Sequence, residues 1–70
     1  MWSLATKIAQ AIAKYGSKAW DAIKQGAANV YNAAKEAWDA GVWAFTKWLA
    51  SNGGALYAIY DALKAFGLID

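Results

Sequence analysis

Apolar residues recur at helical spacing along the whole chain. In the first stretch Leu4, Ile8 and Ile12 are spaced four residues apart, and lysines gather on the opposite side. The later stretches keep a helical spacing, and none shows the apolar–polar alternation that is typical of a strand. The pattern therefore predicts an all-α chain of about five short helices, which we place at residues 3–15, 17–25, 27–40, 42–51 and 55–66.

Glycines separate the predicted helices. Gly16 suits the left-handed conformation that ends a helix, and the Ser17 hydroxyl is expected to cap the helix that follows. The Asn-Gly-Gly run at 52–54 is the strongest break in the chain, and the last helix is expected to begin after it. Short helices with brief connections predict a compact bundle that forms a single domain over residues 1–70.

The apolar stripes also predict the core. On the last three helices they would bury the following large side chains: Val30, Tyr31, Trp38, Val42, Phe45, Trp48, Leu49, Leu56, Ile59, Tyr60, Leu63 and Phe66. Eighteen alanines and the absence of proline favour helices, and the absence of cysteine excludes a disulfide. Because alanine buries little apolar area, the large residues must supply most of the core.

Residues that carry catalytic chemistry are scarce. There is no histidine and no cysteine, so the commonest general base and the thiolate metal ligands are missing. Glu36 and Asp39 share one helix face, but Lys35 is adjacent and the arrangement is typical of a solvated surface. We therefore expect a protein that is not an enzyme and that holds no cofactor and no metal.

The net charge of +2 is unevenly distributed. Residues 1–35 contain five lysines and one acid, a balance of +4, whereas residues 36–70 contain two lysines and four acids, a balance of −2. Only the front half of the chain is suited to attract an anionic surface.

Lysine and tryptophan together indicate a membrane-binding surface. Tryptophan favours the membrane–water interface, and lysine can lay its methylenes on an apolar surface while its ammonium stays near lipid phosphate. The expected partners are anionic bacterial membrane lipids. Trp2 and Trp43 lie at an end or off the apolar stripe and are the candidates for exposure, whereas Trp20 fits either the core or the surface. The candidate membrane-binding residues are Lys7, Lys14, Lys18, Lys24, Trp2, Trp20 and Trp43.

The segment Ile12-Ala13-Lys14-Tyr15-Gly16-Ser17-Lys18-Ala19 resembles the region near the start of leaderless bacteriocins of the aureocin and lacticin Q type. These are small, cysteine-free antibacterial proteins rich in lysine and tryptophan. The resemblance implies a compact, saposin-like bundle of helices that permeabilises the membranes of Gram-positive bacteria without processing. We expect this action on the lipid to need no protein receptor. It also implies a protein that is secreted without a signal peptide and acts at the target cell membrane.

Other interpretations of the sequence stay open. A helical module that docks a partner protein, or a structural or designed bundle without activity, would show the same periodicity. A circular relative, with residues 68–70 joined to Met1 and Trp2, is a further variant. The absence of arginine and of a known DNA-binding pattern weighs against nucleic acid. We expect a monomer in solution.

Overall fold

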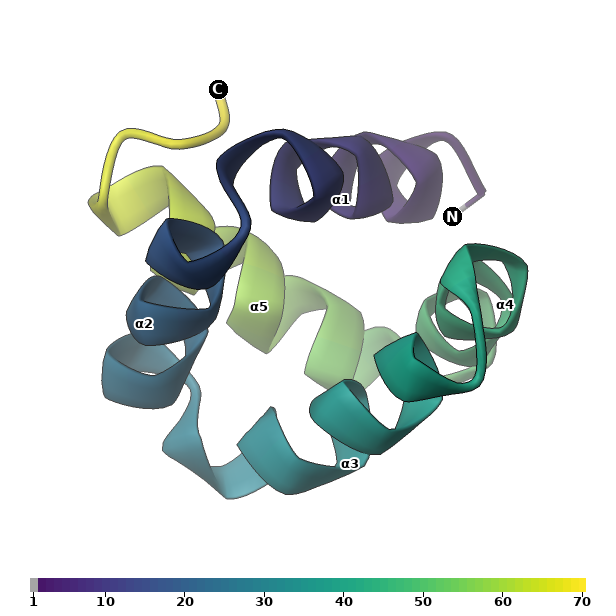
Figure 1. Ribbon diagram of the computed structural model, residues 1–70. Coiled ribbons are helices and arrows are strands. Elements are labelled where there is room, and N and C mark those ends of the chain that lie inside the picture. Colours follow the sequence, from purple (N-terminus) through teal and green to yellow (C-terminus); the bar gives the residue numbers. More distant parts are fainter. Residues whose placement is uncertain (1) are drawn as a thin grey trace.

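Five helices account for most of the computed structural model, which describes residues 2–70 (Figure 1). No strand is present in that range. The helices are α1 (Trp2–Tyr15), α2 (Ser17–Gly26), α3 (Ala28–Asp39), α4 (Val42–Ser51) and α5 (Gly53–Ala65). The predicted all-α fold with five short helices is therefore confirmed. Met1, which the circular variant would join to residue 70, lies outside the described residues.

The helices pack into a nearly isotropic body of 23 × 22 × 22 Å. The α1 helix packs against α4, α2 packs against α5, and α3 connects these two pairs through contacts with α2 and α4. In Figure 1, α1 lies along one edge of the molecule and α3 along the opposite edge. The largest fully buried side chains come from four helices and are Ile8, Ile12, Ile23, Phe45, Leu49, Leu56, Ile59 and Leu63.

A cluster of aromatic rings joins three helices. The Trp20 ring of α2 meets the Tyr31 and Trp38 rings of α3 edge-on, at centroid distances of 5.8 and 6.1 Å. The Phe45 ring of α4 lies 6.1 Å from the Trp20 ring and 5.2 Å from the Trp38 ring. These edge-to-face arrangements place the positive ring edges against the negative faces, which stabilises each pair beyond its buried area. We call these four rings, with the Trp48 ring that stacks on Phe45, the ring cluster.

Two predicted features of the helix ends are wrong. The residue that precedes α2 is Gly16, with φ of 58°, and no side-chain hydrogen bond caps this helix, so the Ser17 hydroxyl does not act as predicted. The expected three-residue break at 52–54 is reduced to Asn52, because both glycines that follow belong to the first turn of α5. The Asn52 side-chain amide donates a hydrogen bond of 2.7 Å to the Trp48 carbonyl and so satisfies the end of α4.

Burial at the helix ends also differs from the prediction. Val42 and Phe66 were expected in the core, but both are exposed. Val42 is the first residue of α4 and Phe66 follows the last residue of α5, so neither side chain has a neighbouring helix turn on both sides. Trp38, Trp48 and Tyr60 are only partly buried, at the margin of the core. Apolar periodicity identifies which face of each helix is buried, but it does not show where along the helix the contact with a neighbouring helix ends.

Gly26 permits the close approach of α2 and α5. A Cβ atom at this position would lie 2.6 Å from the Ala62 Cβ and 3.1 Å from the Ala62 Cα. The second distance is to backbone of α5, which cannot move as a flexible side chain can. A side chain at Gly26 would therefore push the two helices apart.

We expect Gly26→Ala to lower the free energy of unfolding by about 1–3 kcal/mol, because the added methyl group overpacks the contact between α2 and α5. In an Ala62→Gly background the same substitution should cost less, since the Cβ at 2.6 Å is gone and only the Cα at 3.1 Å remains. Urea unfolding, followed by the circular dichroism of the helices, gives the free energy of unfolding of the parent chain, the two single variants and the double variant. An equal loss in both backgrounds would contradict the close contact.

Candidate membrane-binding surface

Two indole rings stack on the surface where α1 and α4 begin. Trp2 is the first residue of α1 and Trp43 is the second of α4, and their ring centroids are 5.4 Å apart with an interplanar angle of 20°. The side chains are 47% and 70% exposed, and the exposed Val42 is next to Trp43 in the chain. Because α1 packs against α4, residues distant in sequence form one exposed apolar pair. We call Trp2 and Trp43 the indole pair.

Trp20 is a core residue and not a surface residue. Its side chain is 8% exposed, and it lies in the ring cluster described above. The Lys35 ammonium lies 5.1 Å from the Trp20 ring centroid, which is a favourable position for a cation–π contact. The candidate role of Trp20 at a lipid surface is therefore not available in the folded chain. Ala19, Trp20 and Ile23 share one face of α2, and all three are buried.

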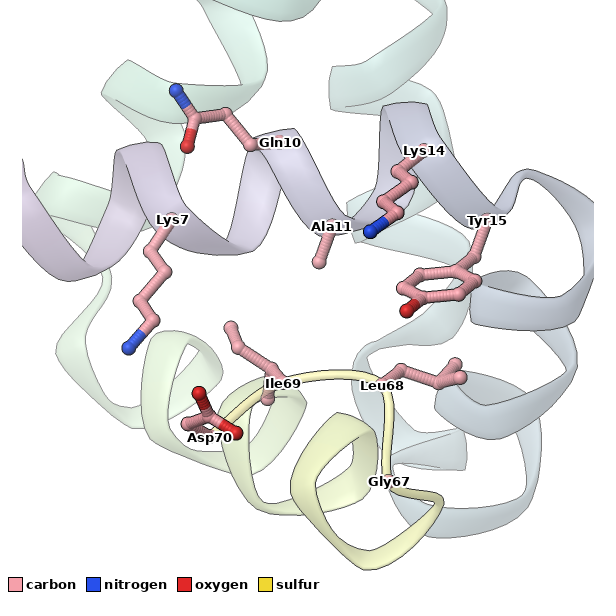
Figure 2. Close-up of a pocket in the computed structure, with 9 residues that line it drawn as sticks. All are labelled: Lys7, Gln10, Ala11, Lys14, Tyr15, Gly67, Leu68, Ile69 and Asp70. Atoms are coloured by element: carbon pink, nitrogen blue, oxygen red, sulfur yellow. The ribbon is translucent and has the colours of Figure 1, made fainter.

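Lys7 and Lys14 lie along the same flank of α1. They are seven residues apart, which is two helical turns or about 10 Å. Both line a pocket of about 310 Å³ between α1 and the segment that follows α5. Figure 2 shows the Lys7 ammonium reaching toward Asp70, while the Lys14 ammonium lies near Tyr15. The Lys14 nitrogen is 5.3 Å from the Tyr15 ring centroid.

The outward side of α1 lies between the indole pair and these two lysines. With about 3.6 residues per turn, Trp2 falls on the flank next to α4, and Lys7 and Lys14 fall on the other flank. The exposed residues between the two flanks are uncharged and small or polar: Ser3, Thr6, Gln10 and Ala13. We call this surface, from the indole pair across to Lys7 and Lys14, the α1 face. It can present aromatic rings and ammonium groups to one flat partner.

The structure separates the two candidate lysines of α2. Lys18 lies in the first turn of α2, directly after the end of α1, and is exposed. Lys24 lies in the last turn, about 9 Å further along the helix axis. A cation is favoured at a helix C-terminus and disfavoured at an N-terminus, so the position of Lys24 stabilises the helix and that of Lys18 does not. Lys24 therefore stabilises the C-terminal end of α2, and it lies away from the α1 face.

Sequence reasoning missed the pairing of Trp2 with Trp43 and the exposure of Val42. No local signal in the sequence reports that α1 packs against α4, so the stacking of the two indoles is visible only in the tertiary structure. The orientation of Trp43 toward Lys47 was visible in the sequence, because residues four apart on a helix share a face. Lys47 is exposed on α4, about one helical turn after Trp43.

Comparisons with known proteins give no match: no family model, no curated protein and no solved structure is similar to this chain. Among residues 2–70 there is no group of three or more acidic side chains placed to hold a metal ion. None of the helices in this range has both the length and the apolar character of a membrane span.

We expect the two aromatic environments to respond differently to the same substitution. Trp20→Phe should lower the free energy of unfolding by about 1–3 kcal/mol, because it removes ring contacts inside the core. Trp43→Phe should change it by less than about 0.5 kcal/mol, because the ring is largely in solvent. Urea denaturation followed by circular dichroism compares the two variants. A larger loss for Trp43→Phe would contradict the placement of these rings.

Proposed function

We propose that this protein binds anionic bacterial membranes through the α1 face and permeabilises them. The observation that carries the proposal is the indole pair, two large rings stacked in solvent on one flank of the α1 face, while exposed Lys7 and Lys14 lie on the other flank. The resemblance of residues 12–19 to leaderless bacteriocins points to the same activity. The partner is the lipid surface itself, and no protein receptor is required.

Charge supports the first step of binding. The front half of the chain carries a balance of +4, and Lys7, Lys14 and Lys18 are exposed on or next to the α1 face. Each lysine near an anionic bilayer contributes about 1 kcal/mol of attraction. This attraction orients α1 toward the membrane before any side chain enters it.

The indole pair supports the second step. An indole at the headgroup level keeps its N–H hydrated while its ring leaves water, and the exposed fractions of Trp2 and Trp43 leave a large area free for this transfer. Short amphipathic helices can then lie in the interface with their apolar faces toward the acyl chains. The α1 helix has such a face, formed by Ala5, Ile8, Ala9 and Ile12. Separation of α1 from the bundle would disorder lipid packing and cause leakage.

Dye-loaded vesicles test the function directly. We expect leakage from vesicles that contain phosphatidylglycerol and none from vesicles of phosphatidylcholine alone, because the neutral surface offers no charge attraction. The Trp2→Ala/Trp43→Ala double variant should bind the anionic vesicles at least about tenfold more weakly, since two indoles no longer enter the interface.

A matched control for the indoles is Phe66→Ala, which removes an exposed aromatic ring outside the α1 face. It should bind the anionic vesicles with nearly the affinity of the parent chain. Absence of leakage from both vesicle types at saturating protein would remove the proposed function. The same exposed indoles would also suit a docking module for another protein, and that alternative would then take its place.

Lys18 offers a test that separates stability from binding. Lys18→Gln should raise the free energy of unfolding by about 0.3–1 kcal/mol, because it removes a cation from the positive end of α2. Its affinity for anionic vesicles should fall about fivefold, because one lysine next to the α1 face is lost.

Lys24→Gln is the charge-matched counterpart of this substitution. It should lower the stability by a similar amount, since Lys24 lies in the last turn of α2, and should retain most of the affinity. Urea unfolding and vesicle titrations measure both variants. Equal losses of affinity would show that total charge, and not the α1 face, governs binding.

A further inference from the structure

The chain reverses direction after α5. Gly67 has a φ of 73°, a left-handed backbone conformation that residues other than glycine rarely adopt. The Gly67 N–H donates to the Lys64 carbonyl at 3.0 Å, and the Leu68 N–H donates to the Leu63 carbonyl at 2.9 Å. This pair of hydrogen bonds is a Schellman motif, which ends α5 and turns the following residues back. We call residues 67–70 the strap.

The strap lies opposite the cationic flank of α1. Figure 2 shows Lys7, Ala11 and Lys14 on one side of the pocket and residues 67–70 on the other. The Ile69 side chain points toward α1, and the Asp70 carboxylate lies on the side of the pocket toward which Lys7 reaches. The strap therefore places one carboxylate and two apolar side chains across the pocket from the lysines that the α1 face would offer to lipid.

Few contacts hold the strap in this position. Leu68 and Ile69 are only partly buried against the core. The Tyr60 hydroxyl donates a hydrogen bond of 2.6 Å to the backbone carbonyl of Asp70. Residues of the strap and of α1 line a pocket of about 310 Å³ that opens to solvent. A short segment with few buried contacts can open while the helices stay folded.

We propose that the strap is an autoinhibitory cover of one flank of the α1 face, beside Lys7 and Lys14, while the indole pair stays exposed. This cover is closed in water and displaced at an anionic lipid surface. This inference rests on the proposed function and concerns the regulation of the same site. Lipid phosphate replaces the Asp70 carboxylate as the negative group beside Lys7. Leu68 and Ile69 then leave the pocket and enter the interface, where apolar side chains are favoured. Once the strap has moved, the ammonium groups of Lys7 and Lys14 can both contact lipid phosphate.

Tyr60→Phe tests this cover without a change of charge. The substitution removes the hydrogen bond to Asp70 and keeps the ring. Loss of one such bond should raise the open population about fivefold, so the Leu68 amide should exchange with deuterium about fivefold faster in the absence of lipid. Leakage should then begin at a lower fraction of anionic lipid than for the parent chain. Tyr31→Phe, which keeps its ring against Trp20, is the matched control and should change neither measurement.

Asp70→Asn tests the electrostatic part of the cover. It removes the carboxylate that lies near Lys7 and should increase the affinity for anionic vesicles about fivefold. Asp39→Asn makes the same change of net charge on α3, at the opposite edge of the molecule, and should have a smaller effect. Equal gains for the two variants would overturn the role of Asp70.

The outcomes distinguish the cover from the proposed function. Faster exchange at Leu68 in Tyr60→Phe together with earlier leakage supports the cover. Faster exchange with unchanged leakage, while the parent chain still permeabilises anionic vesicles, overturns the cover alone. Unchanged exchange of the Leu68 amide in Tyr60→Phe would show that the Tyr60 hydrogen bond does not hold the strap closed. A parent chain that leaves all vesicles intact overturns both proposals.

Discussion

The ring cluster is the interaction on which the rest of this structure depends. In a chain of 70 residues with eighteen alanines, most helix positions bury little area. The rings of Trp20, Trp38 and Phe45 supply a large apolar contact at the point where α2, α3 and α4 meet. Small alanine side chains between them let the helices approach closely, as Gly26 and Ala62 show for α2 and α5. A few large rings and many small residues thus take the place of a disulfide or a metal ion in holding a small domain together.

One indole is buried, two are partly buried at the margin of the core, and the remaining two are exposed and paired. Trp2 and Trp43 stack on each other in solvent because α1 and α4 begin side by side. A pair of exposed aromatic rings is costly for a protein that meets only water. At a lipid interface the same arrangement is favourable, since the rings leave water and the ammonium groups stay near phosphate. The proposed function rests on this difference between water and the lipid interface.

Two different segments border the outward side of α1. The α4 helix borders one flank and carries Trp43, and the strap borders the other and carries Asp70. The α4 border is held by the contact between two helices, whereas the strap is held by one side-chain hydrogen bond and partly buried residues. The α1 face therefore has one stable flank, with the indoles, and one flank whose cover can open without unfolding the bundle.

The sequence by itself determined the five helices, because apolar spacing and glycine punctuation are local signals that act within each segment. It also determined the charge imbalance, and it indicated the exposure of Trp43 because this residue lies off the apolar stripe of its helix. Only the tertiary structure decided that Trp20 is buried, that Val42 and Phe66 are exposed, and that the two outer indoles stack. These outcomes depend on which helices are neighbours and where each contact ends. Helix packing brings together residues far apart in the chain, and periodicity within one helix carries no information about its partner.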